Sequence, residues 1–386
     1  MNRIMLKILR YASPTTPALR LAMSAVVLAA LAACSSTGKP KPAELQANPA
    51  SLGVRQAWSL RIPAVTFPLQ TNVSGDTVTV AGANGVVVSI DSRSGQENWR
   101  ASIGAPLSAG VGSDGSMAAV VTEANELVAL REGKVLWKQK LTARGYTAPL
   151  VAGRRVFVQT ADRTISAWDG ESGRRLWAQP RTAENLVLRK PGVFLAVGDT
   201  LVAGIGGRLA GLSPANGASR WESPIAAPRG TNDVERLVDL TGSVARTGDT
   251  VCARAYYVNV GCVDTARGVL LWSKPASGAE GLSGDENFVY GTESNGDVVA
   301  WRRSDGERAW SSERLKYREL TAPLAVGRSL VIGDGKGLVH FVSREDGSTL
   351  NRLTPDGSPI VAAPVLSGNT VVVVTRNGGV FGYRPE

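Results

Sequence analysis

The three cysteines of this sequence, Cys34, Cys252 and Cys262, are the side chains whose type could do covalent chemistry. Each could be a buried core residue, one half of a disulfide, or a nucleophile that is modified. His340 is the only histidine in the 386 residues, which argues against histidine-based catalysis and against a metal site with several histidines. The role of each cysteine depends on the elements that position it.

Residues 1–33 have the organisation of an export signal. Four basic residues and no acidic residue precede position 21, residues 21–33 carry no charge, and small residues lead up to Cys34. Thirteen apolar residues are too few for a membrane span, which needs about 20. The alternative, a short buried helix, has nothing to pack against, because a basic leader precedes it and a polar, proline-containing stretch follows it.

The residues LAAC at positions 31–34 resemble the lipobox of bacterial lipoproteins. This resemblance implies cleavage before Cys34, a diacylglycerol on its thiol and a further acyl chain, such as palmitate, on the new amino terminus. Two or more acyl chains anchor a protein firmly, whereas one alone is marginal. Ser35, rather than Asp, follows the cysteine, and by resemblance to the sorting pattern of enteric bacteria this favours the outer membrane. We expect residues 34–52 to form a lipidated flexible linker.

A repeat of about 40 residues organises the rest of the chain. In each unit a glycine is followed four residues later by a tryptophan, and successive positions from Trp58 to Asn351 are 41, 38, 40, 44, 51, 38 and 41 residues apart. In the last unit Gly347 is kept but Asn351 replaces the tryptophan. The complete pairs are Gly95–Trp99, Gly133–Trp137, Gly173–Trp177, Gly217–Trp221, Gly268–Trp272 and Gly306–Trp310.

Four short strands in each unit are typical of a propeller blade. The sequence therefore predicts an all-β fold over residues 53–386, an eight-bladed β-propeller of four-stranded antiparallel blades. Residues 54–62 should complete the final blade beside residues 369–384, which closes the ring and leaves no open edge. The glycine supplies a positive φ in a turn. We expect the tryptophan to fill the gap between adjacent blades rather than to stack on a ligand.

The repeat also places the other two cysteines. The hairpin around Cys252 and Cys262 aligns with the hairpin of the first unit, where Thr79 and Ser89 lie opposite each other across the turn. Directly opposed residues of an antiparallel pair are close enough for a disulfide, and an exported domain can hold one. We hypothesise a Cys252–Cys262 bridge; two reduced buried thiols are the alternative.

The spacing Asp, Gly, Trp after Asp91, Asp169 and Asp264 resembles the repeat of the quinoprotein-like propellers. Enzymes of that group hold a quinone over the central channel, beside Ca²⁺ and a ring formed by two adjacent cysteines. This sequence has no adjacent cysteines and lacks the long insertions that wall the pocket. Its aspartates recur in register, as turn residues do, rather than converging as metal ligands. We therefore expect no catalytic residues, no metal and no cofactor, with a periplasmic quinoprotein-like dehydrogenase kept as an alternative.

Composition bears on two other classes of partner. Part of the net charge of +10 belongs to the signal, and no Lys/Arg run with interleaved aromatics supports a nucleic-acid partner. A cell-wall or carbohydrate-binding propeller would need exposed aromatic side chains. Trp168 and Trp301, which lie outside the Gly–Trp pairs, occupy matching positions in their units and are expected to be structural.

The lipobox, the short linker and the Gly–Trp repeat together resemble the BamB family of outer-membrane-protein assembly factors. This resemblance implies a non-enzymatic scaffold lipoprotein of the β-barrel assembly (BAM) machinery, at the periplasmic face of the outer membrane. Its partners would be the POTRA domains of BamA and, indirectly, other BAM lipoproteins. The chain would be a monomeric subunit within that hetero-complex.

Two insertions relative to the repeat, residues 183–192 and 231–243, carry the expected contacts with the partner. Long loops on one face of a ring are natural binding elements. By their match to segments of the family that bind BamA, the expected contact residues are Leu186, Leu188, Arg189, Arg236 and Asp239. Thr241 stands where the family often has a second acid, which departs from the pattern. The alternative is that the first segment is the opening strand of a blade, with both leucines facing the core.

Overall fold

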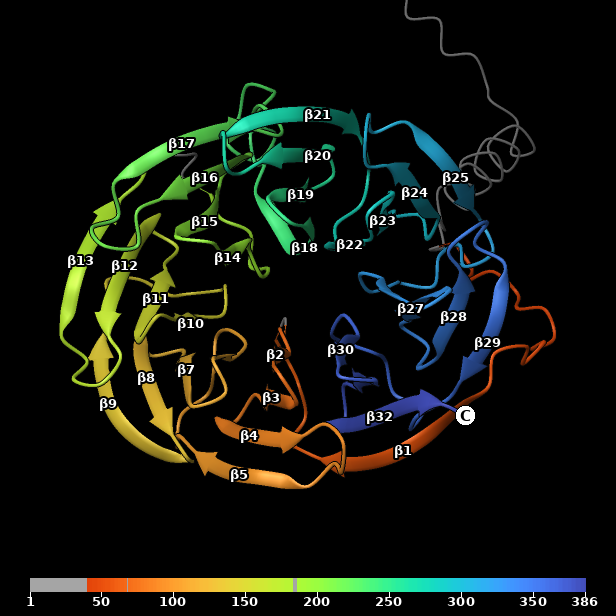
Figure 1. The fold of residues 1–386 in the computed structure, drawn as a ribbon, viewed down its shortest axis with the longest axis horizontal. Coiled ribbons are helices and arrows are strands. Elements are labelled where there is room, and N and C mark those ends of the chain that lie inside the picture. Colours follow the sequence, from red (N-terminus) through yellow and green to blue (C-terminus); the bar gives the residue numbers. More distant parts are fainter. Residues whose placement is uncertain (1–39, 68, 183–185) are drawn as a thin grey trace, which may run out of the picture. The chain divides into compact units, whose positions relative to one another are not determined.

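The computed structural model describes residues 40–67, 69–182 and 186–386. The chain divides into two compact units, Met1–Lys41 and Pro42–Glu386, and the second is described here. Within the described ranges, 32 strands form eight four-stranded antiparallel sheets arranged as the blades of a ring (Figure 1). The predicted eight-bladed propeller is therefore confirmed. The described part of the chain has no helix that is both long and apolar enough to cross a membrane.

Each blade runs from an innermost to an outermost strand, and the blades follow one another around the ring. Blade 1 is β2 (Asn72–Ser74), β3 (Thr77–Ala81), β4 (Val86–Asp91) and β5 (Glu97–Ser102); blade 2 is β6 (Gly112–Ser113), β7 (Met117–Val121), β8 (Glu126–Arg131) and β9 (Lys134–Lys140); blade 3 is β10 (Leu150–Ala152), β11 (Arg155–Gln159), β12 (Thr164–Asp169) and β13 (Arg175–Pro180); blade 4 is β14 (Phe194–Val197), β15 (Thr200–Ile205), β16 (Arg208–Leu212) and β17 (Ser219–Pro224). Blade 5 is β18 (Leu240–Thr247), β19 (Thr250–Ala255), β20 (Asn259–Asp264) and β21 (Val269–Pro275); blade 6 is β22 (Leu282–Gly284), β23 (Phe288–Thr292), β24 (Val298–Arg302) and β25 (Arg308–Ser312); blade 7 is β26 (Leu324–Val326), β27 (Ser329–Gly333), β28 (Val339–Ser343) and β29 (Thr349–Leu353); blade 8 is β30 (Val365–Ser367), β31 (Thr370–Val374), β32 (Gly379–Pro385) and β1 (Val54–Arg61).

Blade 8 closes the ring as the sequence predicts. Its outermost strand β1 comes from the beginning of the propeller and pairs antiparallel with β32 from its end, with Trp58 opposite Gly382. Because the first and last strands of the propeller pair in one sheet, both have a neighbour, and the ring has no unpaired edge between its first and last blades.

The middle strands are buried on both faces, because each blade is packed between two neighbours. In β3 and β4 almost every residue is buried, and the same is true of β31, which explains its continuous run of valines at 371–374. The outer strand β5 is different, since most of its side chains are exposed at the circumference of the ring. Burial therefore falls from the middle of each blade toward the rim.

The repeated glycine and tryptophan meet between blades. Trp137 of blade 2 lies against the turn of blade 3, where Gly173 has φ +69° and a Cβ would lie 2.6 Å from the indole ring. The indole Nε1 of Trp137 donates a hydrogen bond to the carbonyl oxygen of Gly170 at 2.8 Å. This confirms the predicted position of the tryptophans. Equivalent indole bonds join Trp58 to Ser92, Trp177 to Pro214, Trp272 to Arg303 and Trp310 to Arg344.

Asn351 replaces the tryptophan at the one place where no such turn exists. The next turn of the ring would join β32 to β1, but the end of β32 and the start of β1 lie there instead. The Asn351 amide nitrogen donates to the carbonyl oxygen of Leu52 at 2.7 Å. A short amide thus makes, to the segment that enters β1, the bond that an indole makes elsewhere.

Cys252 and Cys262 lie directly opposite each other on β19 and β20, as the alignment of the repeat units predicts. Both are fully buried between blades 5 and 6. The structure joins their sulfur atoms in a disulfide with a Cα–Cα distance of 3.9 Å. The bridge links two neighbouring strands of a single blade.

Candidate functional site

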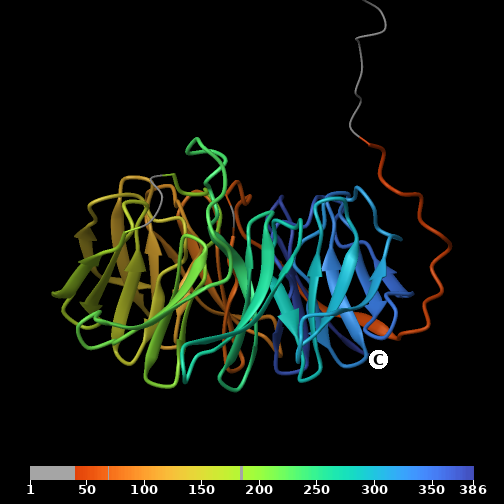
Figure 2. The same ribbon diagram turned by 90° about the horizontal axis from the view of Figure 1, so that it is seen from above.

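The two insertions lie on one face of the ring, which we call the loop face. This face carries the turns between the second and third strands of each blade, such as 82–85 and 334–337, and the connections from each blade to the next. Residues 186–192 enter blade 4 and residues 225–239 enter blade 5. Figure 2 shows the connection between β17 and β18 standing above the ring. The opposite face carries the turns that contain the repeated glycines.

The described part of the first insertion is a loop rather than a strand. Residues 186–188 belong to no strand, and blade 4 begins only at Phe194. The alternative that this segment opens a blade, with both leucines in the core, is therefore wrong. Leu186 is 39% exposed, Leu188 is half-buried and Arg189 is exposed. Residues 183–185 and the expected lipid-attachment residue Cys34 lie outside the described residues.

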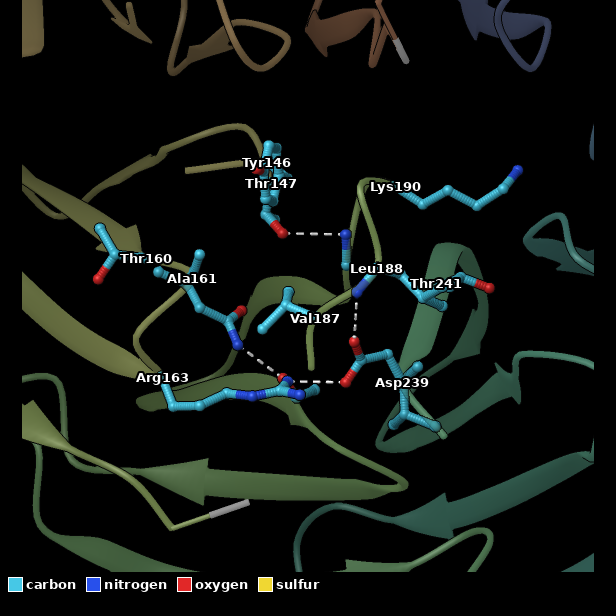
Figure 3. A pocket seen from close by; sticks show the side chains of 14 residues that line it. Tyr146, Thr147, Thr160, Ala161, Arg163, Val187, Leu188, Lys190, Asp239 and Thr241 are labelled. Carbon is cyan, nitrogen blue, oxygen red and sulfur yellow. Dashed lines mark hydrogen bonds and ion pairs between the residues drawn. The ribbon is translucent and has the colours of Figure 1, made fainter. Parts of the chain in front are cut away.

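The buried carboxylate of Asp239, in the second insertion, binds the first insertion directly and through Arg163. Its Oδ1 accepts a hydrogen bond from Arg163 Nη1 at 2.7 Å, and its Oδ2 accepts one from the backbone nitrogen of Leu188 at 2.9 Å (Figure 3). Arg163 Nη2 donates to the carbonyl oxygen of Leu186 at 2.6 Å. The side chains of Arg163 and Asp239 are only 9% and 10% exposed. Both oxygens of Asp239 are thus used within the chain to hold the loop in place.

Arg163 is the residue of this cluster that sequence reasoning missed. It lies in the turn between β11 and β12 with φ +63°, a conformation that L side chains rarely adopt. The matching turns of blades 1, 6, 7 and 8 have Gly85, Gly296, Gly337 and Gly378 at positive φ. An arginine at a position where glycine recurs could have indicated a functional residue from the sequence. Backbone strain of this kind is retained where the side chain makes a required contact.

The second insertion is organised by short-range bonds. The side-chain oxygen of Asn232 accepts hydrogen bonds from the backbone nitrogens of Val234 and Glu235 at 3.1 and 3.0 Å, a turn typical of asparagine. The backbone nitrogen of Thr231 donates to the Glu235 carboxylate, and this bond lowers the pKa of Glu235. The turn leaves Val234 73% exposed. Arg236 is half-buried, and its backbone nitrogen donates to the Asn232 carbonyl.

Arg189 and Lys190 project differently from the same loop. The Arg189 guanidinium is 58% exposed and lies 3.7 Å from the Glu123 carboxylate, a distance and exposure at which an ion pair contributes little. Lys190 Nζ donates to Glu280 Oε1 at 2.6 Å. Both Lys190 and Glu280 line a central cavity of about 710 Å³, whose wall also includes Phe67. Arg189 is thus the cation that the loop holds out toward solvent.

The charged groups of the loop face do not form a metal site among the residues described. No group of three or more His, Cys, Asp or Glu side chains in the described ranges is placed to hold a metal ion. Three acids in or beside the loops, Glu123, Asp239 and Glu280, each pair with a different cation. The arrangement is that of exposed side chains, among them Leu186, Val234 and Arg189, presented by loops that a buried ion pair holds in place.

Known proteins with similar sequences share the whole propeller. The family model described as "Outer membrane protein assembly factor BamB" matches residues 83–312. A protein of that name from Burkholderia pseudomallei is 39% identical over 98% of this chain and 99% of its own length. Its counterpart from Bordetella pertussis is 35% identical over 92% of this chain and 95% of its own.

Solved structures agree with the sequence relatives. The crystal structure of BamB from Moraxella catarrhalis has a TM-score of 0.78 and 26% identity, and the match covers 86% of this chain and 99% of that one. A quinohemoprotein alcohol dehydrogenase from Comamonas testosteroni has a TM-score of 0.66 at 15% identity, covering 89% and 79%, which shows a shared fold alone. On the family model and on these near-full-length relatives, the chain belongs to the BamB family of outer membrane protein assembly factors.

Proposed function

We propose that the chain is a non-enzymatic scaffold lipoprotein of the BAM machinery. It is tethered through Cys34 to the periplasmic face of the outer membrane. Its loop face binds the POTRA domains of BamA, which assists the folding and insertion of outer-membrane proteins. The observation that carries this proposal is the buried Arg163–Asp239 pair, which fixes the loop at 186–190 on a rigid ring.

The physical argument for a binding surface is preorganisation. A loop that is already held in its bound shape loses less conformational entropy on association, so more of its contact energy becomes affinity. Leu186 and Val234 are large apolar side chains held at the surface, and interfaces gain most from such groups when a partner covers them. Arg189 adds a cation that can make a two-pronged contact to a carboxylate of the partner.

Asp239 has a different role in this proposal from the one the sequence suggested. The sequence predicts a direct contact with the partner, whereas its carboxylate is buried and bonded to Arg163 and Leu188. We therefore assign it the task of positioning the loop. Leu186, Leu188 and Arg189 remain the proposed contact residues, and Arg236 would support the base of the second insertion.

The test is recovery of BamA with the tagged full-length chain from detergent-solubilised membranes. The paired changes Leu186→Asp and Arg189→Glu should reduce recovered BamA at least about tenfold, which corresponds to roughly 1.4 kcal/mol. Arg174→Glu reverses an exposed cation on the opposite face and serves as the matched control. Undiminished recovery with both loop changes in a folded protein would refute this binding face.

Membrane attachment needs its own test. Cys34→Ala should remove the protein from the outer-membrane fraction, because in the proposal both cleavage and acylation depend on this cysteine. Intact-mass analysis of the wild-type protein should show the added acyl chains. A Cys34→Ala variant that stays with the outer membrane in cells lacking BamA would contradict lipid anchoring.

A further inference from the structure

Residues 43–52, which we call the N-terminal strap, run along the outside of blade 7. The Ala43 backbone nitrogen donates to the Lys316 carbonyl at 2.9 Å, and the Ser51 backbone nitrogen donates to the Leu350 carbonyl at 2.8 Å. Between them, the Asn48 side-chain nitrogen donates to the Asn351 side-chain oxygen at 3.0 Å. The sequence predicts a flexible linker over 34–52, yet this part of it is bonded to the ring at both ends and in the middle.

Arginines of the ring hold the strap by its oxygens. Arg318 donates to the Ala43 carbonyl at 3.2 Å, Arg352 to the Gln46 carbonyl at 2.8 Å and Arg328 to the Ser51 carbonyl at 2.9 Å. Arg318 is itself fixed, since its Nε donates to the fully buried Asp334 carboxylate at 2.7 Å. Bonds to backbone carbonyls hold the path of the strap whatever its side chains are.

Apolar contacts reinforce the two ends of the strap. Leu45 packs on a core cluster shared by blades 6 and 7, and Leu52 packs on a cluster shared by blades 7 and 8. The strap is therefore docked by burial as well as by hydrogen bonds.

The strap has a direction across the ring. Ala43 lies at the connection between β25 and β26, on the loop face, while residue 53 lies at the opposite face where β1 begins. Figure 2 shows this segment, in orange, running down the outside of the ring to the start of β1 near the C-terminus. The chain that leads back toward Cys34 therefore leaves the propeller on the loop face.

Chain length then limits how far that exit can be from the site of lipid attachment. Ala43 is nine residue steps after Cys34, and a fully extended chain spans about 3.4 Å per step. The rim of the loop face at Ala43 is thus within about 30 Å of the lipid-bearing residue. The same upper limit is larger for the opposite face, because the thickness of the ring is added to it.

We propose that the N-terminal strap orients the propeller on the membrane, with the loop face toward the lipid surface and the opposite face away from it. This inference rests on the proposed lipid attachment at Cys34. Its consequence is that Leu186, Val234 and Arg189 are presented on the membrane side of the ring.

The test measures energy transfer from the full-length lipidated protein to labelled lipid. A fluorescent amino acid is placed at Lys336 on the loop face or at Glu345 on the opposite face, both exposed residues of blade 7. The protein is bound to vesicles of phosphatidylethanolamine and phosphatidylglycerol that carry an acceptor on the headgroups. Transfer should be at least about twofold more efficient from Lys336, because transfer falls steeply with distance.

Two changes should abolish this difference. The first releases the strap by combining Leu45→Ser, Arg314→Ala and Arg352→Ala, where Arg314 bonds the Gln46 side chain. Arg308→Ala, an exposed arginine of the same region without a contact to the strap, is its control. The second change inserts about 20 Gly/Ser residues between Lys41 and Pro42, which lengthens the tether without touching the ring.

The outcomes separate this inference from the proposed function. Strong transfer from Lys336 that is lost in both altered proteins, with flotation of the vesicles and bound protein unchanged, supports orientation by the strap. Equal transfer from the two faces of the unaltered, floating protein overturns it and leaves lipid anchoring intact. Protein that does not float with the vesicles overturns lipid anchoring and the orientation together.

Discussion

The rim of the propeller and its loop face hold parts of the ring together by different means. At the rim, a tryptophan such as Trp137 packs on a turn glycine such as Gly173 in the next blade, and the same contact recurs around the ring. On the loop face, Arg163 of blade 3 reaches Asp239 before blade 5, and the matching turns of four other blades carry glycine instead. One contact is apolar and repeated, and the other is a charged contact specific to the two insertions.

This difference separates what stabilises the ring from what shapes a surface. Repeated apolar contacts between neighbours add up to the stability of a repeat protein. A buried ion pair contributes little net stability, because removing both charges from water costs about as much as their attraction returns. Its value is that only one arrangement of the loop satisfies both charges. We therefore expect damage at the rim to unfold the ring and damage at Asp239 to act mainly on the loop.

The largest effect should come from Gly173→Ala. A Cβ at this position would lie 2.6 Å from the Trp137 ring, and φ is +69°, so overpacking and backbone strain together should cost about 4 kcal/mol of unfolding free energy. Gly153→Ala is the control in the same blade, since it shares a positive φ but no atom lies within 4 Å of its Cβ. Urea unfolding measures both, and equal losses would show that the Trp–Gly contact is not what matters.

Asp239→Ala should have the next largest effect, about 3 kcal/mol, because it leaves the buried Arg163 guanidinium without its carboxylate. The rate of backbone amide hydrogen exchange should increase more at residues 186–192 than in the blades. The double change Arg163→Met and Asp239→Leu should recover most of the stability, since no buried charge remains.

Recovery of BamA then distinguishes positioning from direct contact. If Asp239 positions the loop, the stable double variant still binds poorly, because the Leu188 backbone nitrogen has lost its acceptor. Normal recovery of BamA by that variant would mean that the loop needs no such support.

The fold could be predicted from sequence because its cause is periodic. Gly95 and Trp99 recur in later units at spacings that alignment of the chain with itself reveals, and ring closure by residues 54–62 follows from the leftover strands at each end. The opposition of Cys252 and Cys262 follows from the same alignment. Local, repeated patterns of this kind carry their structural meaning without knowledge of distant contacts.

The site was less predictable because its contacts are made once and between distant residues. Arg163 and Asp239 are 76 residues apart in sequence, with blade 4 between them, and they meet only in the folded ring. The exposed position of Leu186 was foreseen, but the burial of Asp239 was not. The strap escaped prediction for the same reason, since Asn48 and Asn351 are 303 residues apart and a polar, proline-containing segment reads as a linker.

Removing the disulfide tests whether blade 5, which follows the longest insertion, needs this covalent link for its stability. Cys252→Ala with Cys262→Ala should cost about 2 kcal/mol, because a closed loop of roughly ten residues no longer restricts the unfolded chain. The loss should be uniform, affecting the rim contact at Trp272 and the loop face alike. Urea unfolding of the wild-type protein with and without reductant makes the same comparison. An unfolding free energy that does not change with reductant would mean that the thiols are free.

The smallest effect should come from pH, and it should act on the loop face alone. His340 and Asp334 are buried side by side beneath the turn at 334–337, with His340 Nε2 2.9 Å from an Asp334 oxygen. Burial lowers the pKa of His340 below its ordinary 6.5; the bond to Asp334 acts to raise it, but that effect is smaller, and the charges of Arg318 and Arg352 add to the lowering. Burial acts to raise the pKa of Asp334, but hydrogen bonds from His340 and the Leu338 backbone hold it below its usual value.

The direction of the pH effect follows from which state takes up the proton. Below pH 6.5 the unfolded chain protonates His340 while the folded chain keeps it neutral, so stability is complete above that pH and falls as the pH drops toward the lower folded pKa. The slope is at most about 1.4 kcal/mol per pH unit. Asp334 stays ionised in both states across this window and adds no slope, and the Trp–Gly contacts of the rim contain no titratable side chain. His340→Gln can keep a hydrogen bond to Asp334 and should flatten the dependence in urea unfolding between pH 7 and 5, whereas an unchanged slope would place the responsible group elsewhere.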